Sequence, residues 1–396
     1  MRRAANVDSA AQRRWVLILG TIVAIGPMTI DMYLPSLPGL QAYFGADTSE
    51  VQLTLSAYFL GLALGQLVYG PLADRHGRRI PLLAGLALYT FASLACALAP
   101  TIEVLIAMRF VQAVGGCAGI VISRAMVRDR FEPQQMARIV SSMVLVMGVA
   151  PILAPLAGGQ ILRFAGWQAI FLALTLFGVI CLVAARTLPE TLAQRAPPIR
   201  MGAVIRGYAG LLRHRHFMGY ALAAGIGSAG MFAYISGAAF VFIEVFGIAP
   251  DHFGWFFGAN AAGLVAASQL NGLLLRRYKA ERIVRGALAA FAACAWLLVL
   301  TAATGWGGLW GVALPLFFCI GSLGFNFPNA TAAAMAPLGD RAGLASALMG
   351  TLQFAVAAVA GAAVGHFHDG TPLPMALVIA VCATGALTVL HVLARP

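Results

Sequence analysis

The chain has 396 residues, of which 61% are hydrophobic and only 10% are charged, and its formal net charge is +12. Soluble globular domains typically contain about 25% charged and about 45–50% apolar residues. The composition therefore excludes an ordinary soluble domain and indicates a protein that lies mostly in lipid.

Apolar stretches long enough to cross a bilayer recur along the whole chain. About 20 apolar residues span the hydrocarbon core of a membrane. We therefore expect an all-α integral membrane protein with twelve transmembrane helices in two six-helix bundles. The predicted spans are residues 15–36, 51–71, 80–99, 104–126, 139–162, 168–186, 217–245, 252–275, 284–304, 308–335, 343–365 and 373–393.

A change of composition after the sixth span divides the chain. The segment that begins TLPETLAQRAPPIR carries prolines and mixed charge, which is typical of a linker. We predict an N-terminal bundle at residues 1–186, a linker at residues 187–215 with a short helix around Met201–Leu212, and a C-terminal bundle at residues 216–396. Paired bundles of this kind place the substrate near the membrane midplane between them.

The basic residues follow the predicted topology. Of the 26 Lys and Arg residues, 24 lie before the first span, after the last span or in loops on that same side. The positive-inside rule makes that side cytoplasmic, together with both termini. The net charge is thus explained by topology, and we expect no nucleic-acid partner. The six cysteines lie within predicted spans without CxxC spacing, which favours buried apolar packing over disulfides or metal ligation.

The loop GPLADRHGRR between the second and third spans is rich in charge and has glycines that allow a sharp reversal. It closely resembles the corresponding loop of the major facilitator superfamily, a family of secondary transporters. The resemblance implies the major facilitator fold and a role for the loop in conformational gating; a plain basic turn is the alternative. The residues concerned are Gly70, Asp74, Arg75, Gly77 and Arg78.

Two further motifs support the same family. RFVQAVGG, from Arg109 in the fourth span, is similar to the family pattern R-x-x-Q-G-x-G, with Ala113 in place of a glycine. APILAPLAGGQI in the fifth span resembles the motif that marks antiporters of the family, and its key residues are Pro151, Pro155, Gly158 and Gly159. DMYLPSLP, from Asp31, is similar to the signature of the Bcr/CflA group of drug/proton antiporters.

Asp31 and Arg109 are the candidate proton-coupling residues. With 1.5 Å per helical residue, Asp31 lies about 9 Å and Arg109 about 8 Å below the outer ends of their spans. Contact between the two side chains is therefore geometrically possible. Burial favours a neutral carboxyl group and a nearby guanidinium favours the anion, so a bound substrate can alter the proton affinity of Asp31. The alternative is that Asp31 caps the helix end and faces water.

Polar and aromatic residues within the spans are candidates for the substrate cavity, although packing roles are also open. These candidates are Tyr33, Tyr58, Met147, Tyr234, Asn260 and Asn326. The sequence contains no GxSxG, Walker or HExxH motif, so we predict that the chain is not an enzyme and requires no cofactor. We also predict no metal site, because the histidine pairs lack further ligands at zinc spacing.

The motifs together predict a multi-pass transporter of the bacterial inner membrane that exports lipophilic small molecules in exchange for protons. Its partners are then the substrate, protons and membrane lipid, and we expect a monomer. One alternative is a proton-coupled metabolite carrier of the same fold, for nucleosides or amino-acid-like solutes. Another is a sensor or scaffold that keeps the fold without transport.

Overall fold

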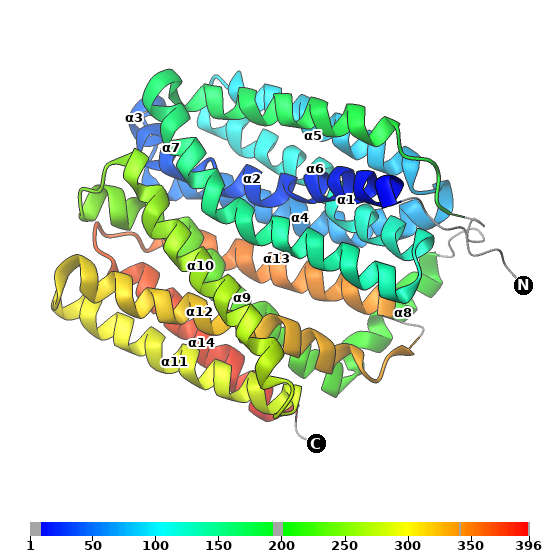
Figure 1. Cartoon of the computed structure of the whole chain (residues 1–396). Coiled ribbons are helices and arrows are strands. Elements are labelled where there is room, and N and C mark those ends of the chain that lie inside the picture. Colours follow the sequence, from blue (N-terminus) through cyan, green and yellow to red (C-terminus); the bar gives the residue numbers. More distant parts are fainter. Residues whose placement is uncertain (1–8, 193–200, 340–341, 395–396) are drawn as a thin grey trace, which may run out of the picture.

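The computed structural model describes residues 9–192, 201–339 and 342–394, and none of these is in a β-strand. Its helices run nearly side by side along one axis (Figure 1). They are α1 (Ser9–Val23), α2 (Ile25–Asp31), η1 (Leu34–Ser36), α3 (Leu37–Phe44), α4 (Thr48–His76), α5 (Arg79–Ala97), α6 (Ile102–Arg130), α7 (Pro133–Arg186), α8 (Met201–Arg213), α9 (Arg215–Ala239), η2 (Phe240–Val245), α10 (Pro250–Leu274), α11 (Ala280–Thr304), α12 (Gly308–Met335), α13 (Ala342–His366) and α14 (Leu373–Leu393).

The expected membrane-spanning architecture is confirmed. Within the described residues, ten helices are long and apolar enough to cross a membrane. One of them lies in α7, which bends at Gly166 and so supplies two spans. Helix α10 is long enough but less apolar, since it carries Asp251, His252 and Asn260. With α7 counted as two spans and α10 added, the structure has the twelve predicted spans.

Gly166 explains how α7 makes this bend. Its φ of 77° and ψ of 177° interrupt the helix in a region of backbone space that is open almost only to glycine. The sequence analysis separates the two spans at residues 162 and 168, on either side of this glycine. The break between the fifth and sixth spans is therefore confirmed.

Several helices extend beyond the predicted spans. The first span continues through α2, η1 and α3 to Phe44, and α6 continues to Arg130. Hydropathy marks only the part of a helix that lies in lipid, whereas backbone hydrogen bonds and caps set its ends. Asp47, for example, forms a capping box with Glu50 at the start of α4.

The linker contains the predicted short helix. Helix α8 spans Met201–Arg213, within one residue of the expected bounds. Residues 193–200, which belong to the predicted linker, lie outside the described part of the chain. In Figure 1, α8 lies at the same end of the molecule as the N-terminus.

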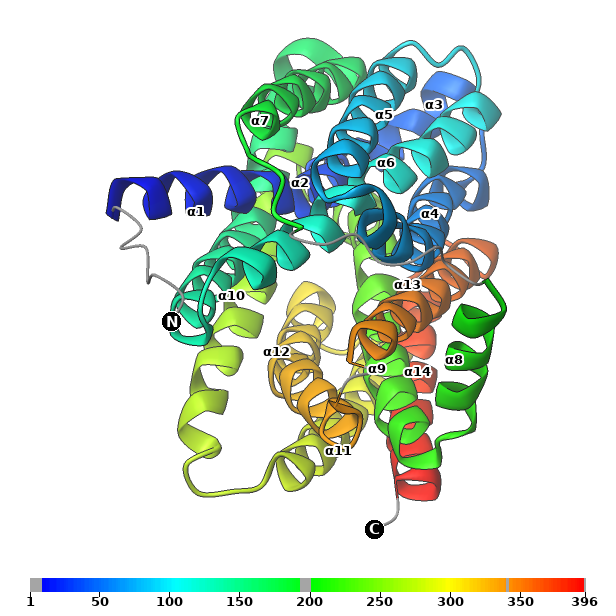
Figure 2. The same cartoon turned by 90° about the vertical axis from the view of Figure 1, so that its right-hand side faces the viewer.

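The helices form two sets that meet along a seam. Helices α1 to α7 contact one another, and so do helices α9 to α14; the two sets meet chiefly where α4 packs on α13 and where α7 packs on α10. Figure 2 shows the first set above the second. Smaller contacts join α10 to η1, α9 to η1 and α3 to η2.

Glycines allow the close approach along the seam. A Cβ atom on Gly361 of α13 would lie 2.8 Å from Oγ of Ser236 and 3.1 Å from Oγ of Ser56. A Cβ atom on Gly254 of α10 would lie 2.8 Å from the backbone nitrogen of Leu156 in α7. Small residues of this kind let transmembrane helices pack backbone to backbone.

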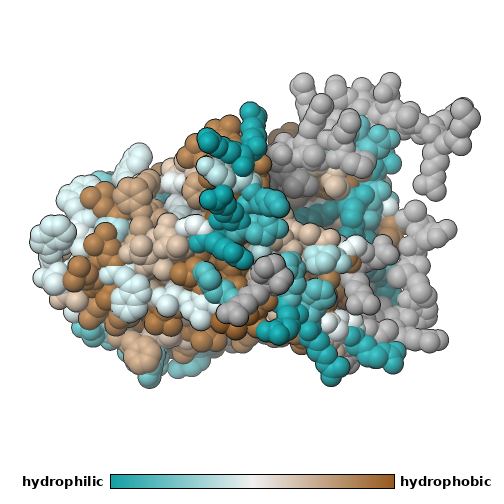
Figure 3. All heavy atoms as spheres, turned by 90° about the horizontal axis from the view of Figure 1, so that it is seen from below, coloured by the Kyte–Doolittle hydropathy of each residue, from teal (hydrophilic) through white to brown (hydrophobic). Residues whose placement is uncertain are grey.

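The molecular surface fits insertion in a bilayer. Large apolar side chains such as Leu176, Val381 and Phe318 are exposed. Figure 3 shows broad apolar areas on the side of the molecule, while hydrophilic side chains gather toward the end where the chain termini lie. The chain is thus a multi-pass membrane protein with one strongly polar end.

Candidate functional site

Asp31 lies buried at the seam between the two helix sets. It ends α2, only 4% of its surface is exposed, and it makes no hydrogen bond or salt bridge within the described residues. Its carboxyl group lies within electrostatic range of the hydroxyls of Tyr58 on α4 and Tyr234 on α9. A lone buried carboxyl group therefore lies in a region that side chains from both halves of the molecule share.

Arg109 is fully buried on α6 inside a cage of aromatic rings. Its guanidinium carbon lies 4.4 Å from the ring centre of Tyr58, 4.7 Å from that of Tyr33 and 5.8 Å from that of Phe171. Cation–π attraction of this kind is strongest where water is absent. Two of its guanidinium nitrogens, Nε and Nη2, have no hydrogen-bond partner.

Arg109 and Asp31 do not form a salt bridge in this structure. Nη1 of Arg109 instead donates to Oε1 of Gln112 at 2.7 Å and to the carbonyl of Thr29 at 3.3 Å. Side chains two residues apart on a helix point in nearly opposite directions, about 200° around the axis. The Thr29 side chain faces Tyr89 in the N-terminal half, so Asp31 turns toward the seam.

Further polar contacts hold this region of the N-terminal half. Nε2 of Gln112 donates to Oγ of Ser93 at 2.8 Å, and the hydroxyls of Thr29 and Tyr89 are 2.7 Å apart. The hydroxyl of Tyr33 lies 3.0 Å from Oγ1 of Thr54. The sequence analysis gives Gln112, Thr29 and Tyr89 no role at the site. Gln112 was detectable, because residues three apart share a helix face.

The cavity candidates of the C-terminal half lie in two places. Asn260 donates from Nδ2 to the hydroxyl of Tyr234 at 3.0 Å, and the Tyr234 ring stacks on Phe257. Oδ1 of Asn260 has no partner, so it remains free to accept a hydrogen bond. Asn326 on α12 is buried with both amide atoms unpartnered and lies against Gly227 of α9, away from this pair.

The remaining cavity candidates divide between the two halves. Tyr33 and Tyr58 pack directly on Arg109, while Met147 is half-buried on α7. An aromatic contact joins the two halves. The ring centre of Phe232 on α9 lies 4.7 Å from that of Phe59 on α4 and 5.6 Å from that of Phe354 on α13. Aromatic rings thus surround Arg109 and also join the two halves.

The charged loop after α4 forms a compact ion network. Nη1 of Arg78 donates to Oδ1 of Asp74 at 2.5 Å, and its Nε donates to Oδ2 of Asp129 at 2.7 Å. Only 3% of the Arg78 surface is exposed. By contrast, Arg75 is exposed, and a Cβ atom on Gly70 would have no neighbour within 4 Å.

Glu190, a few residues after the end of α7, binds the backbone of the same loop. Its carboxylate accepts hydrogen bonds from the backbone N–H groups of Arg78 at 2.8 Å and Arg79 at 3.1 Å. Although partial burial raises the pKa of Glu190, hydrogen bonds from four backbone N–H groups lower it more, so the net pKa lies below its ordinary value. Asp129 and Glu190 were not among the sequence-predicted site residues.

The two glycines of the APLAGG segment face different halves. A Cβ atom on Gly158 would collide with the backbone carbonyl of Met32, which follows α2. A Cβ atom on Gly159 would lie 2.7 Å from the carbonyl oxygen of Pro250, at the start of α10. Pro151 and Pro155 lie within the same helix, α7. This segment therefore packs next to Asp31 on one side and against the C-terminal half on the other.

The described residues contain no group of three or more His, Cys, Asp or Glu side chains that could hold a metal ion. The site offers instead one carboxyl group, a caged guanidinium, tyrosine hydroxyls and an amide. Such groups can bind a proton and hydrogen-bond a small solute, but they supply no nucleophile with an adjacent base.

Comparisons with known proteins show the family of the chain. Residues 17–362 match the family model described as the Major Facilitator Superfamily. The chain is 37% identical over 371 residues to an uncharacterized MFS-type transporter, YdgK, of Bacillus subtilis (strain 168), covering 92% of each protein. It is 32% identical over 370 residues to a bicyclomycin resistance protein homolog of Haemophilus influenzae, covering 93% of each.

A solved structure shows the same fold. The xylose transporter XylE from E. coli, in a partially occluded inward-open conformation, aligns with a TM-score of 0.76 at 12% sequence identity. The alignment covers 96% of this chain and 97% of the other. At this low identity the similarity concerns the fold alone.

Proposed function

Because the chain belongs to the Major Facilitator Superfamily, a family of membrane transporters, we propose that it is a proton-coupled antiporter. It exports small amphipathic drugs across the inner membrane of a bacterium. The resistance function printed in the name of its Haemophilus relative supports drug export. The protein acts as a monomer, with both termini and the basic loops in the cytoplasm.

The observation that carries this proposal is the isolated position of Asp31. Removing an ionised carboxylate from water costs several kcal/mol unless a cation or strong donors compensate. Asp31 has no such partner within the described residues. Its carboxyl group is therefore stable here when it holds a proton, or when a substrate places a positive charge or a donor group beside it.

Exchange follows from this competition. A drug that enters between the halves approaches Asp31, Tyr234 and the free Oδ1 of Asn260. Substrate and proton then stabilise the same carboxyl group in turn, so the arrival of one favours release of the other. Arg109 adjusts this balance when the site rearranges, because Gln112 and the aromatic cage keep its charge buried in the same half of the molecule.

Alternating access moves the two bundles, residues 1–186 and 216–396, against each other while the linker at residues 187–215 joins them. The glycine contacts between α4 and α13 and between α7 and α10 form the seam that opens. The network of Asp74, Arg78 and Asp129 lies at the cytoplasmic end and controls the change between states.

Drug/proton exchange in everted membrane vesicles tests the proposal. Addition of bicyclomycin or tetraphenylphosphonium to energised vesicles should release protons from the lumen, as read by acridine orange fluorescence. Asp31→Asn, which keeps the size of the side chain, should abolish this response while membrane insertion is retained. Asp251→Asn is the matched control, because Asp251 forms its salt bridge with the exposed Arg163. Full exchange by Asp31→Asn would disprove the assignment.

A panel of solutes separates drug export from the metabolite carrier. If nucleosides or amino acids caused proton release and no lipophilic drug did so, the protein would be a metabolite carrier and not a drug exporter. Ligand-induced proton release by the purified protein would exclude a scaffold without transport.

A further inference from the structure

A second cavity lies far from Asp31, at the end of the C-terminal half where α10 finishes and α11 begins. Its volume is about 420 Å³. It is lined by Leu274 of α10, Tyr278 of the connecting loop, the first turns of α11 and Phe325 of α12. None of the residues assigned above to proton coupling, gating or substrate binding lines it.

The cavity has the form of a groove along one face of α11. Arg282, Gly286 and Ala290 follow one another at intervals of four residues and therefore lie on the same face, over about 12 Å. Gly286 and Ala290 are exposed, and a Cβ atom on Gly286 would have no neighbour within 4 Å. The groove thus leads from a charged end into an apolar channel of small side chains, open to the surroundings of the helix bundle.

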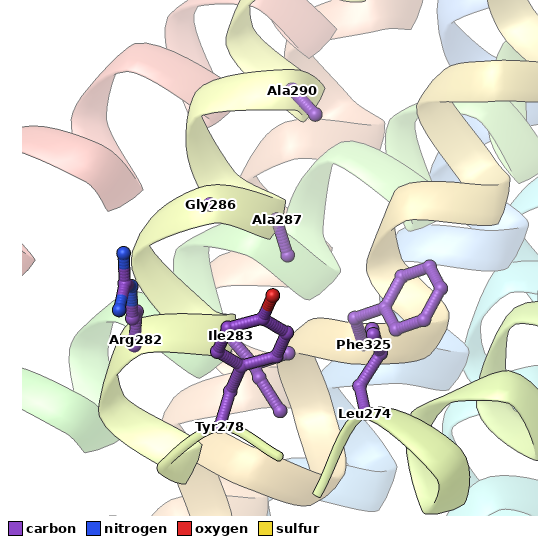
Figure 4. A pocket seen from close by; sticks show the side chains of 8 residues that line it. All are labelled: Leu274, Tyr278, Arg282, Ile283, Gly286, Ala287, Ala290 and Phe325. Carbon is purple, nitrogen blue, oxygen red and sulfur yellow. The ribbon is translucent and has the colours of Figure 1, made fainter.

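The charged end of the groove is strongly cationic. Residues 276–285 contain five Lys or Arg residues and one acidic residue. None of these basic side chains forms a salt bridge with a carboxylate of the described chain. The guanidinium groups of Arg282 and Arg277 lie 5.5 Å and 5.8 Å from the ring centre of Tyr278. Figure 4 shows the Tyr278 ring between Arg282 on one side and Leu274 and Phe325 on the other.

These features together match one kind of ligand. Basic pockets between transmembrane helices on the cytoplasmic side bind anionic lipid head groups, and tyrosine favours the same interfacial level. A soluble anion would use the arginines but not the apolar channel. A neutral lipophilic solute would use the channel but not the excess of cations.

We propose that this groove binds an anionic glycerophospholipid of the inner leaflet. The phosphate lies at Arg282 and Arg277, the Tyr278 hydroxyl contacts the head group, and one acyl chain follows Gly286 and Ala290 between Leu274 and Phe325. The leaflet rests on the membrane orientation given in the proposed function, whereas binding itself does not depend on transport. The lipid joins α10, α11 and α12 at their polar ends and stabilises the C-terminal half.

Native mass spectrometry of the purified full-length protein tests the site, with phosphatidylglycerol and phosphatidylcholine as probes. The wild-type protein should retain phosphatidylglycerol and not phosphatidylcholine. Arg282→Gln should weaken retention roughly tenfold, as expected when a charge-assisted hydrogen bond is lost. Gly286→Leu should weaken it to a similar degree by filling the channel, and phosphatidylglycerol should raise the melting temperature of wild type but not of either variant.

Matched controls come from neighbouring positions outside the groove. Arg276→Gln removes one charge from the same loop. Gly272→Leu adds a leucine side chain on α10, at a glycine that also has open space around it. Both should bind the lipid like wild type. If Arg276→Gln and Arg282→Gln lost lipid retention equally, retention would depend on the net charge of the loop and not on the groove, and the proposed site would be wrong.

Two other results would overturn the lipid site, and a third would overturn its leaflet. Equal retention of phosphatidylcholine would show that the charge has no role. If tetraphenylphosphonium bound in the groove and no lipid was found there, the groove would be an entry site for solutes. Labelling of the variant Lys279→Cys by a membrane-impermeant thiol reagent in intact cells would place the groove in the outer leaflet and overturn the leaflet assignment. The binding and melting readouts use purified protein without a proton gradient, so failure of drug/proton exchange leaves the lipid site intact.

Discussion

The carboxylate of Glu190 occupies the space that a side chain on Gly77 would need. Gly77 has a φ of 90°, and the next two backbone N–H groups, of Arg78 and Arg79, both donate to Glu190. Glu190 is thereby fixed to the loop after α4, more than one hundred positions earlier in the chain. If the loop gates transport as proposed, the segment around Glu190 moves with it.

Replacement of Gly77 by alanine should disrupt this contact. An alanine strains the backbone by about 1–3 kcal/mol at such a φ and ψ, and its methyl group displaces the Glu190 carboxylate. We expect Gly77→Ala to lower the melting temperature and slow drug export in vesicles. Gly70→Ala is the control, because Gly70 has open space around it and should tolerate the change. Similar losses in both variants would show that Glu190 is not the cause.

The Glu190 contact should also depend on pH. Its pKa is lowered in the folded protein, so its stabilising effect is fully present above the ordinary glutamate pKa of about 4.3 and is lost as the pH falls through the lower folded value. Glu190→Gln should therefore melt at a lower temperature than wild type at pH 7, and the difference should shrink below pH of about 4.3. Glu281→Gln, on the exposed first turn of α11, should show no such pattern. A pH-independent difference would contradict the carboxylate role.

Gln52 should oppose closure of the seam between α4 and α13. It is fully buried beside Gly365, and neither of its amide atoms has a hydrogen-bond partner. An unsatisfied buried polar group costs about 1–3 kcal/mol. Gln52→Leu should therefore stabilise the closed seam, raise the melting temperature and slow turnover. Gln269→Leu, at an exposed position of α10, is the control; faster transport by Gln52→Leu would contradict this account.

Arg109 should not be replaceable by lysine. A compact ammonium group cannot donate to Gln112 and also lie flat between the rings of Tyr33 and Tyr58. We expect Arg109→Lys to slow drug/proton exchange roughly tenfold, equivalent to about 1.4 kcal/mol in the activation free energy. Exchange rates in vesicles with equal protein content provide the measurement. Arg163→Lys, at an exposed site, should leave the rate unchanged, and an unaffected Arg109→Lys would show that charge alone is sufficient.

Gly158 should be intolerant of any side chain. A methyl group there collides with the carbonyl of Met32 and pushes α7 away from the chain next to Asp31. We expect Gly158→Ala to lose most transport activity and to melt at a lower temperature. Gly20→Ala is the matched control, because its methyl group would lie 3.6 Å from Val146, an ordinary contact distance. Wild-type exchange by Gly158→Ala would exclude this close approach during transport.

Hydropathy and charge by themselves determined the helical class of the protein, the approximate spans and the break near Gly166, because exclusion of polar backbone and charge from lipid acts on short stretches of chain. The motifs likewise pointed to Asp31, Arg109 and the loop from Gly70 to Arg78. These features depend on residue type and local spacing, which one sequence displays directly.

Only the tertiary structure decided which side chains meet. It left Asp31 without an ion pair, surrounded Arg109 with Tyr33, Tyr58 and Gln112, and brought Glu190 to Gly77. Similar depth in the membrane does not fix the rotation of one helix against another. That rotation follows from close packing of many small and aromatic side chains from distant segments, and no short stretch of sequence contains it.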